Sequence, residues 1–129
     1  MHTILVLEDD KLFQAVIHKK FDDFGWTMLP ARSVVQAREY LANFPEIDAI
    51  WVDHFLLGNG DGLQFVSELK GNAAWKNLPV FVVSGSNDPN QEQSYIQLGV
   101  EKYYTKSEHR LDELIDDIKR VLDAPSFVA

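Results

Sequence analysis

The sequence contains no cysteine and no long apolar run, and it has fewer basic than acidic residues. Without cysteine, disulfides, thiol catalysis and Cys-based zinc sites are excluded. Lys and Arg number 12 against 20 Asp and Glu, giving a net charge of -8 that repels phosphate backbones and anionic lipid, so we expect no nucleic acid and no membrane as a partner. No stretch approaches the roughly 20 apolar residues of a membrane-spanning helix. The start of the chain also lacks the features of a signal peptide, which predicts a cytoplasmic location.

What the sequence does contain is the composition of one folded domain. It has 129 residues, of which 46% are hydrophobic and 25% charged, and this balance is ordinary for a globular protein. The length suffices for one core but not for a second independent domain. We expect the domain to occupy residues 1–123, with residues 124–129 as a C-terminal tail or the start of a linker.

Short apolar stretches alternate with amphipathic ones along the whole chain. The apolar stretches predict five strands: Thr3–Leu7, Trp26–Leu29, Ala49–Val52, Val80–Val83 and Val100–Thr105. The amphipathic stretches predict five helices: Lys11–Phe24, one capped by Ser33 and ending at Phe44, one carrying Leu63 to Leu69, one capped by Asp88 with Pro89 in its first turn and reaching Leu98, and one capped by Ser107 and carrying Leu111 to Leu122. Such alternation predicts an α/β fold, a doubly wound five-stranded parallel sheet with five helices.

Charged and hydroxyl groups stand where the predicted strands end. Glu8 and Asp9 follow the first strand, Asp53 the third, Ser84 the fourth and Lys106 the fifth. In doubly wound folds, ligands bind outside these carboxyl ends. Converging carboxylates repel one another unless a hard cation lies between them, and Mg²⁺ is the natural candidate. Lysine and serine then remain as donors to an anion bound at the metal, for which phosphoryl is the obvious choice.

These residues resemble the receiver domains of bacterial response regulators, and the resemblance covers essentially the whole chain. The motifs that carry it are ILVLEDD at 4–10, VD at 52–53 followed by LLGNGDG at 56–62, VFVVSGS at 80–86 and YYTK at 103–106. None of these motifs is specific to the family by itself, but their combination in this order, each at the end of a predicted strand, is specific. The resemblance implies a flavodoxin-like fold of the receiver type and a phosphoacceptor role in two-component signal transduction.

The resemblance also assigns the acceptor and the metal ligands. It implies that Asp53 attacks the phosphorus of a phosphohistidine on a sensor histidine kinase or histidine phosphotransfer protein. Asp9 and Asp53 would then ligate Mg²⁺ directly, Glu8 would ligate it through water, and the backbone carbonyl of Phe55 would complete the set. On this interpretation the chain is a signalling domain that promotes its own phosphorylation, not an enzyme acting on other substrates.

The remaining residues of the family pattern are expected to neutralise and sense the phosphoryl group. Lys106 would pair with one phosphoryl oxygen and Ser84 would donate to another. Ser84 and Tyr103 would form the switch: the hydroxyl is drawn to the phosphoryl group and the aromatic ring follows, altering a surface that binds a downstream protein target. Tyr104 is expected to face the other side of the sheet. We expect a monomer or a weak homodimer.

The sequence departs from the family pattern at three places. Leu57 stands where a proline is usual, the loop to Asp61-Gly62 is one residue longer than is common, and Ser107 replaces a cis-proline. Because a non-proline cis bond costs roughly 2.5 to 4 kcal/mol, we expect Lys106 and Ser107 to be joined in trans. A bulky Phe55 is expected to shield the phosphoryl group from water and slow self-dephosphorylation.

The same residues bear on three other functions. A phosphorylation-independent pseudo-receiver that only binds partners is the main alternative, and the Ser107 and loop departures keep it open. A phosphohydrolase would need a second acid two residues after the nucleophile, where Phe55 stands. The glycines at 58, 60 and 62 do not have the spacing of a nucleotide-binding loop. His54, beside the acceptor, is interpreted as a side chain that alternates away from the site.

Overall fold

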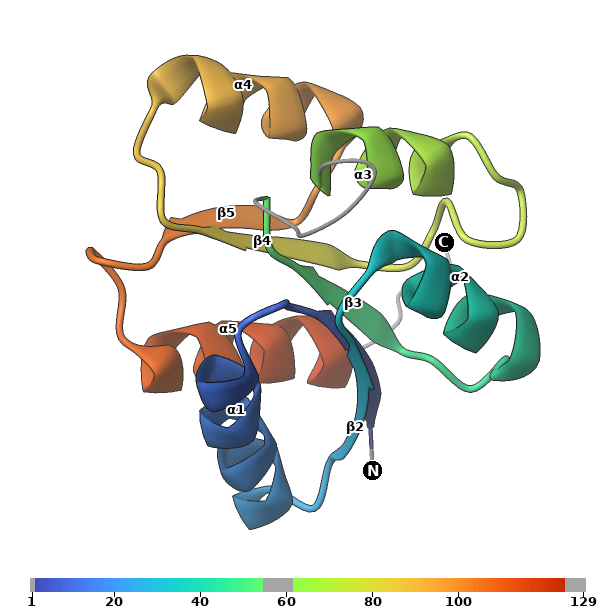
Figure 1. Ribbon diagram of the computed structural model, residues 1–129, viewed down its shortest axis with the longest axis vertical. Helices are drawn as coiled ribbons and strands as arrows, with labels where there is room; N and C mark the ends of the chain where they lie inside the picture. Colours follow the sequence, from blue (N-terminus) through green and yellow to red (C-terminus); the bar gives the residue numbers. More distant parts are fainter. Residues whose placement is uncertain (1, 55–61, 125–129) are drawn as a thin grey trace.

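The protein folds around one parallel sheet whose two faces are both covered by helices (Figure 1). The structure, a computed structural model, describes residues 2–54 and 62–124. The strands are β1 (Thr3–Leu7), β2 (Thr27–Ala31), β3 (Ala49–Val52), β4 (Val80–Ser84) and β5 (Lys102–Thr105). Their order across the sheet is β2-β1-β3-β4-β5, and all the pairings are parallel. The predicted doubly wound α/β fold is therefore confirmed.

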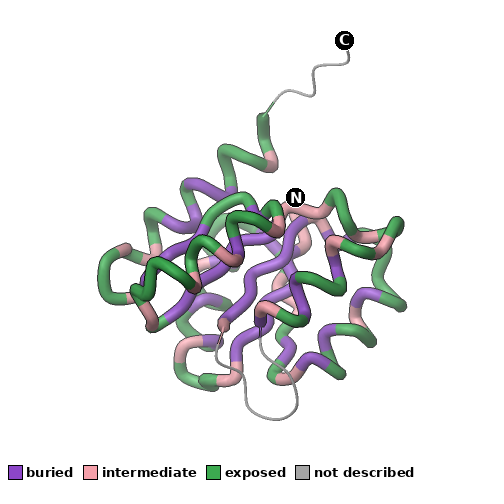
Figure 2. Tube along the Cα trace, turned by 90° about the horizontal axis from the view of Figure 1, so that it is seen from above, coloured by how far each residue is buried: buried purple, intermediate pink, exposed green. Residues whose placement is uncertain are grey.

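The helices divide between the two faces of this sheet. They are α1 (Lys11–Asp23), α2 (Val34–Asn43), α3 (Gly62–Lys70), α4 (Pro89–Leu98) and α5 (Leu111–Asp123). Helices α1 and α5 pack on one face around Trp51, and α2, α3 and α4 pack on the other around Val52 and Tyr95. Each helix buries one side against the strands and exposes the other (Figure 2). Among residues 2–54 and 62–124, none of the helices has the length and hydrophobicity of a membrane-spanning segment.

The register of the central strands brings the chain segments that follow them together. Leu7 pairs with Val52, so Glu8 and Asp53 are the next residues of adjacent strands β1 and β3. Ser84 pairs with Thr105, and the amide of Lys106 donates to the Ser84 carbonyl at 2.7 Å. The strand ends therefore place acidic, hydroxyl and ammonium groups at one edge of the molecule.

Three strands differ from their predicted bounds. β4 runs one residue further than predicted, to Ser84, and β2 begins one residue later, at Thr27. β2 continues through Pro30 to Ala31 instead of ending at Leu29, because at the sheet edge a proline without an N–H breaks no required ladder bond. β5 begins at Lys102, two residues later than predicted, because Val100 follows Gly99, which ends α4 with a φ of 92°.

The predicted cap of the last helix is wrong. The residues after β5 form a turn in which the amide of Glu108 donates to the Thr105 carbonyl at 3.0 Å, and Ser107 is exposed there. Helix α5 begins only after Arg110, and its N-cap makes no side-chain hydrogen bond. The middle of the predicted apolar stripe is buried, at Leu114, Ile115 and Ile118, whereas Val121 near its end is exposed.

Candidate metal centre

The acidic cluster begins where β1 ends. Glu8 is completely buried, and its Oε2 accepts a hydrogen bond from the Asp10 amide at 3.1 Å. Asp10 in turn caps α1, because its Oδ1 accepts from the amides of Leu12 at 2.9 Å and Phe13 at 3.2 Å. Asp10 is therefore a helix cap. This role was not predicted above, although an Asp directly before an amphipathic stretch is the usual sequence signal of a cap.

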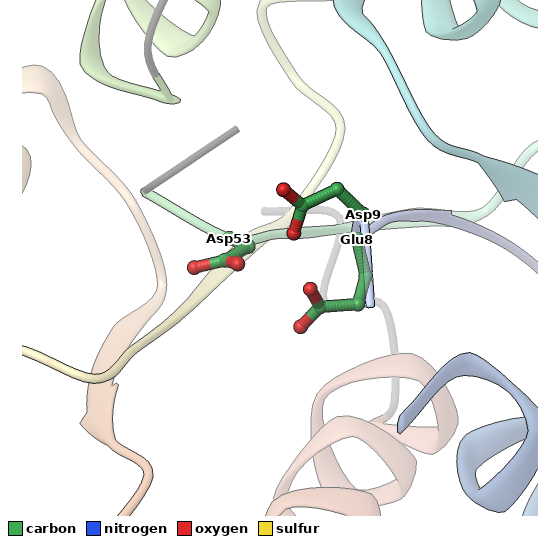
Figure 3. Close-up of side chains that lie close together, drawn as sticks. All are labelled: Glu8, Asp9 and Asp53. Atoms are coloured by element: carbon green, nitrogen blue, oxygen red, sulfur yellow. The ribbon is translucent and has the colours of Figure 1, made fainter. Parts of the chain in front are cut away.

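Three carboxylates converge at this point. Each of Glu8, Asp9 and Asp53 offers one oxygen, and these oxygens all lie within 4.8 Å of one another. Figure 3 shows the three side chains close together, two from the end of β1 and one from the end of β3. Asp53 is only 4% exposed. Carboxylates held this close, with little water to screen them, match the donor set that Mg²⁺ takes from proteins.

Lys106 provides positive charge beside this cluster. Its Nζ lies 2.9 Å from Glu8 Oε1 and 3.7 Å from Asp53 Oδ2. The same ammonium lies 4.7 Å from the centre of the Phe13 ring, so a side chain of α1 lies against the charged end of the lysine beside the site. One lysine does not balance three carboxylates, and the local charge remains negative and suited to a divalent cation.

Burial perturbs the ionisation of this group. Burial, together with the neighbouring Asp53, raises the pKa of Glu8 to about 7, although the hydrogen bond from Lys106 acts in the opposite direction. For Lys106, burial disfavours the ammonium, but the hydrogen bond to Glu8 and the charge of Asp53 outweigh it and raise the pKa of the lysine. Lys106 is therefore protonated at neutral pH and available to an anion.

Ser84 and Tyr103 lie on the adjacent strands β4 and β5 and share a partner. Ser84 Oγ accepts from the Ser86 amide and from Gln91 Nε2, both at 3.1 Å. The Tyr103 hydroxyl donates to the Ser86 carbonyl and accepts from the same Gln91 nitrogen, both at 2.7 Å. Ser84 and Tyr103 are buried. The role of Gln91 could not be predicted from the sequence, because a glutamine on an amphipathic helix carries no signal of its own.

His54 points from the acceptor strand toward α4. Its Nδ1 lies 2.7 Å from the hydroxyl of the fully buried Tyr95. Gly62 closes this corner: a Cβ there would lie 2.6 Å from Tyr95 Oη and 2.8 Å from the Asp53 carbonyl. The interpretation of His54 as a residue directed away from the acidic cluster is in keeping with this contact, and Gly62 is required by close packing.

Some sequence-based expectations concern residues that the structure does not describe. The proposed ligand carbonyl of Phe55, the replacement of proline by Leu57 and the longer loop all fall within residues 55–61, outside the described residues. The Lys106–Ser107 bond is described, and it is trans as predicted. Tyr104 lies in the core between the sheet, α1 and α5, on the face opposite Tyr103, which is also as predicted.

Comparison with known sequences gives matches to proteins of two-component signalling. The family model for the response regulator receiver domain matches residues 4–119. The sensor histidine kinase CheAY of Helicobacter pylori is 30% identical over 106 residues, covering 81% of this chain and 13% of the relative. The phosphate regulon regulator PhoB of Escherichia coli is 28% identical over 119 residues, covering 92% of this chain. The chain spans 51% of the length of PhoB and a much smaller part of CheAY.

Solved structures show the same fold. The phosphorylated cyanobacterial phytochrome response regulator RcpA has a TM-score of 0.84 at 25% identity, with 98% of each chain covered. A two-component response regulator from Clostridium difficile reaches 0.86 at 18% identity, covering 96% of this chain and 98% of that one. The Mn²⁺-bound form of the response regulator Rcp1 gives 0.83 at 24% identity and covers both chains fully.

Proposed function

Because the chain belongs to the response regulator receiver domain family, we propose that it accepts a phosphoryl group on Asp53 from the phosphohistidine of a sensor histidine kinase or histidine phosphotransfer protein. The observation that carries this proposal is the position of the Asp53 carboxylate. It is nearly buried, grouped with two further carboxylates and within 3.7 Å of a lysine ammonium. A carboxylate placed in this way combines a nucleophilic oxygen with groups of both charges that can position a phosphoryl group.

The residues that would hold Mg²⁺ are Asp9 and Asp53 directly and Glu8 through water. Their oxygens are close enough to share one ion, and carboxylates with water are the ligands that Mg²⁺ prefers. Bound Mg²⁺ supplies positive charge that neutralises these carboxylates and the oxygens of the transferring phosphoryl group. The Phe55 carbonyl stays a proposed third protein ligand.

The chain's own residues carry the transfer as follows. An Asp53 oxygen attacks phosphorus and forms an O–P bond while the P–N bond of the phosphohistidine breaks, and the imidazole nitrogen keeps the electron pair. Lys106, already within reach of Asp53, pairs with a phosphoryl oxygen, and Ser84 donates a hydrogen bond to another. The chain thus promotes its own phosphorylation, and we propose that it loses the group slowly by self-dephosphorylation.

The proposed output is a change at the surface formed by α4, β5 and α5. Ser84 turns toward the phosphoryl group and the buried Tyr103 responds to it, so that a downstream protein target is bound differently. Support comes from the shared contacts of Ser84 and Tyr103, which join the strand ends to α4. We propose that this signalling takes place in the cytoplasm and that the chain is a monomer or weak homodimer.

Intact mass measurement after incubation with Mg²⁺ and acetyl phosphate tests the proposal. Wild type should gain one phosphoryl group, and EDTA should prevent the gain. Asp53→Asn should gain none, whereas Asp22→Asn, which removes an exposed carboxylate of α1, should behave as wild type. A gain that persists in Asp53→Asn, or no gain in wild type, would contradict the proposed function.

A further inference from the structure

We infer that Gln91, in the first turn of α4, is a positioning residue for the Ser84 hydroxyl. By donating to the Ser84 oxygen, it leaves the hydroxyl proton of Ser84 free to be donated to a phosphoryl oxygen. The inference rests on the proposed function, because it concerns the same phosphoryl group. It adds a residue outside the strand ends and a physical reason why Tyr103 and Ser84 act together.

The contacts of one nitrogen atom carry the inference. Gln91 Nε2 lies 2.7 Å from the Tyr103 hydroxyl and 3.1 Å from Ser84 Oγ, so it bridges the two. The Tyr103 hydroxyl also lies 2.7 Å from the Ser86 carbonyl. Both hydroxyl-bearing side chains are buried, while Gln91 itself is half-buried at the start of its helix.

Counting protons fixes the direction of each bond. A carbonyl oxygen can only accept, so the single proton of Tyr103 goes to Ser86. The Gln91 atom facing Tyr103 must therefore be a donor, which identifies it as the amide nitrogen and not the amide oxygen. That nitrogen has a second hydrogen, and it is directed at Ser84.

The consequence falls on the Ser84 hydroxyl. A serine oxygen has two acceptor positions and one proton. The two acceptor positions are filled by Gln91 Nε2 and the Ser86 amide, each at 3.1 Å. The proton must then point in a third direction. Because Val52 pairs with Val82, Asp53 and Ser84 end neighbouring strands, and an anion on Asp53 would be a strong acceptor for this proton.

The same bridge couples the switch residues through α4. If Tyr103 leaves its buried position, Gln91 loses one of its two partners, and its amide nitrogen is held less firmly against Ser84 Oγ. Conversely, a hydroxyl already fixed toward the phosphoryl group favours Tyr103 in its buried position. Movement of α4 by a bound target should therefore alter how well the site holds the phosphoryl group.

Binding of the phosphoryl analogue beryllofluoride, with saturating Mg²⁺, tests this inference by ¹⁹F NMR titration of the whole chain. Gln91→Leu removes both donated bonds and should weaken binding about 3- to 10-fold. Gln91→Glu should weaken it further, because a carboxylate accepts the Ser84 proton instead of leaving it for the ligand. A residue that merely pinned α4 would give the opposite order, since Glu keeps the shape of Gln and can still bond both hydroxyls.

Controls separate orientation from added charge and from failure of the site. Gln93→Glu adds the same charge at an exposed position of α4 and should bind as wild type does. In a Ser84→Ala background, Gln91→Leu should have no further effect. If wild type does not bind beryllofluoride, the proposed function fails and this inference with it. If wild type binds but Gln91→Leu is equal to it, or Gln91→Glu binds better than Gln91→Leu, the inference alone is overturned.

Discussion

At the scale of single residues, the site is governed by how little water reaches its charges. Glu8 is fully buried and Asp53 almost so, and the only cation in contact with both, within the described residues, is the half-buried ammonium of Lys106. In such surroundings an ionised carboxylate is stable only when it is paired or bound to a metal. The protonation of Glu8 should therefore respond to both pH and metal.

The metal-free protein should lose stability as Glu8 ionises. Burial and Asp53 raise the pKa of Glu8 from 4.5 to about 7, so between these pH values the native state binds more protons than the unfolded state. This contribution is fully present below pH 4.5 and is lost as the pH rises through 7. Urea unfolding in EDTA at several pH values should show this decline in wild type and not in Glu8→Gln. Parallel pH profiles for the two proteins would refute it.

Phe55 should control the lifetime of the phosphorylated form. Its bulky apolar side chain, two residues after the acceptor, is expected to keep water from the phosphoryl group. Replacing it by a polar residue, in Phe55→Asn, should speed the loss of the phosphoryl group. The measurement is the decay of phosphorylated protein after the phosphodonor is removed, and equal decay rates in the two proteins would discard the idea.

Residue identities at strand ends could be predicted, but contacts made from helices could not. Glu8, Asp9 and Asp53 were placed together because parallel strands end at one edge, and the structure brings them there. Gln91 and the packing of Phe13 on Lys106 depend on how α4 and α1 lie against the sheet. That geometry is set by tertiary packing, which a single sequence does not reveal.

At the scale of elements, the corner between β3, α3 and α4 is packed too closely for any side chain at Gly62. An added Cβ would meet Tyr95 Oη at 2.6 Å, the Asp53 carbonyl at 2.8 Å and the His54 Cα at 2.9 Å. Two of these neighbours are backbone atoms of the acceptor strand's end. The first residue of α3 is therefore in contact with the acceptor's own peptide.

Gly62→Ala should destabilise the protein by about 1–3 kcal/mol, the usual cost of overpacking a filled interior. Gly71→Ala is the matched control, because its Cβ would meet the Ser67 carbonyl at an ordinary 3.5 Å. The free energy of unfolding from urea titrations measures both. Equal effects of the two substitutions would contradict this prediction, because they would show that the residues around Gly62 can shift to accommodate a methyl group.

The contact between β5 and α5 should weaken in alkali. Burial, with the charge of Glu113, raises the pKa of Tyr104 from 10.0 to about 12, and its hydroxyl donates to Asp117 at 2.7 Å. The native state thus holds a proton that the unfolded state releases, and this contribution is present below pH 10 and lost as the pH rises through 12. Tyr104→Phe should be about 1 kcal/mol less stable at pH 7. The deficit should shrink above pH 10, and a constant deficit in urea unfolding would contradict this.

Element boundaries were predictable where local chemistry decides them. Ser33 accepts from the Gln36 amide at 3.2 Å, and Asp88 accepts from the Asn90 amide at 2.9 Å, so two predicted caps are confirmed. Ser107 failed as a cap because the turn after β5 takes up the residues that would have formed the first turn of α5. A hydroxyl residue before an apolar stripe does not by itself say how much chain the preceding turn needs.

At the scale of the whole molecule, the sheet separates two hydrophobic cores, and both support residues at the edge where the strands end and the acidic cluster lies. The core around Trp51 supports α1, which contacts Lys106 through Phe13, and the core around Val52 supports α4, which contacts Ser84 through Gln91. Both cores meet the acceptor strand β3, one on each face. A change at Asp53 is therefore adjacent to helices on both sides of the sheet.

The most direct test of the account is to locate the phosphoryl group on the chain. Borohydride reduces an aspartyl phosphate to homoserine, which peptide sequencing by mass spectrometry can then place. After incubation with acetyl phosphate and Mg²⁺, homoserine should replace Asp53 and none of the other acidic residues, and EDTA should prevent it. Homoserine at another position, or a phosphorylated chain with Asp53 unmodified, would contradict the central claim.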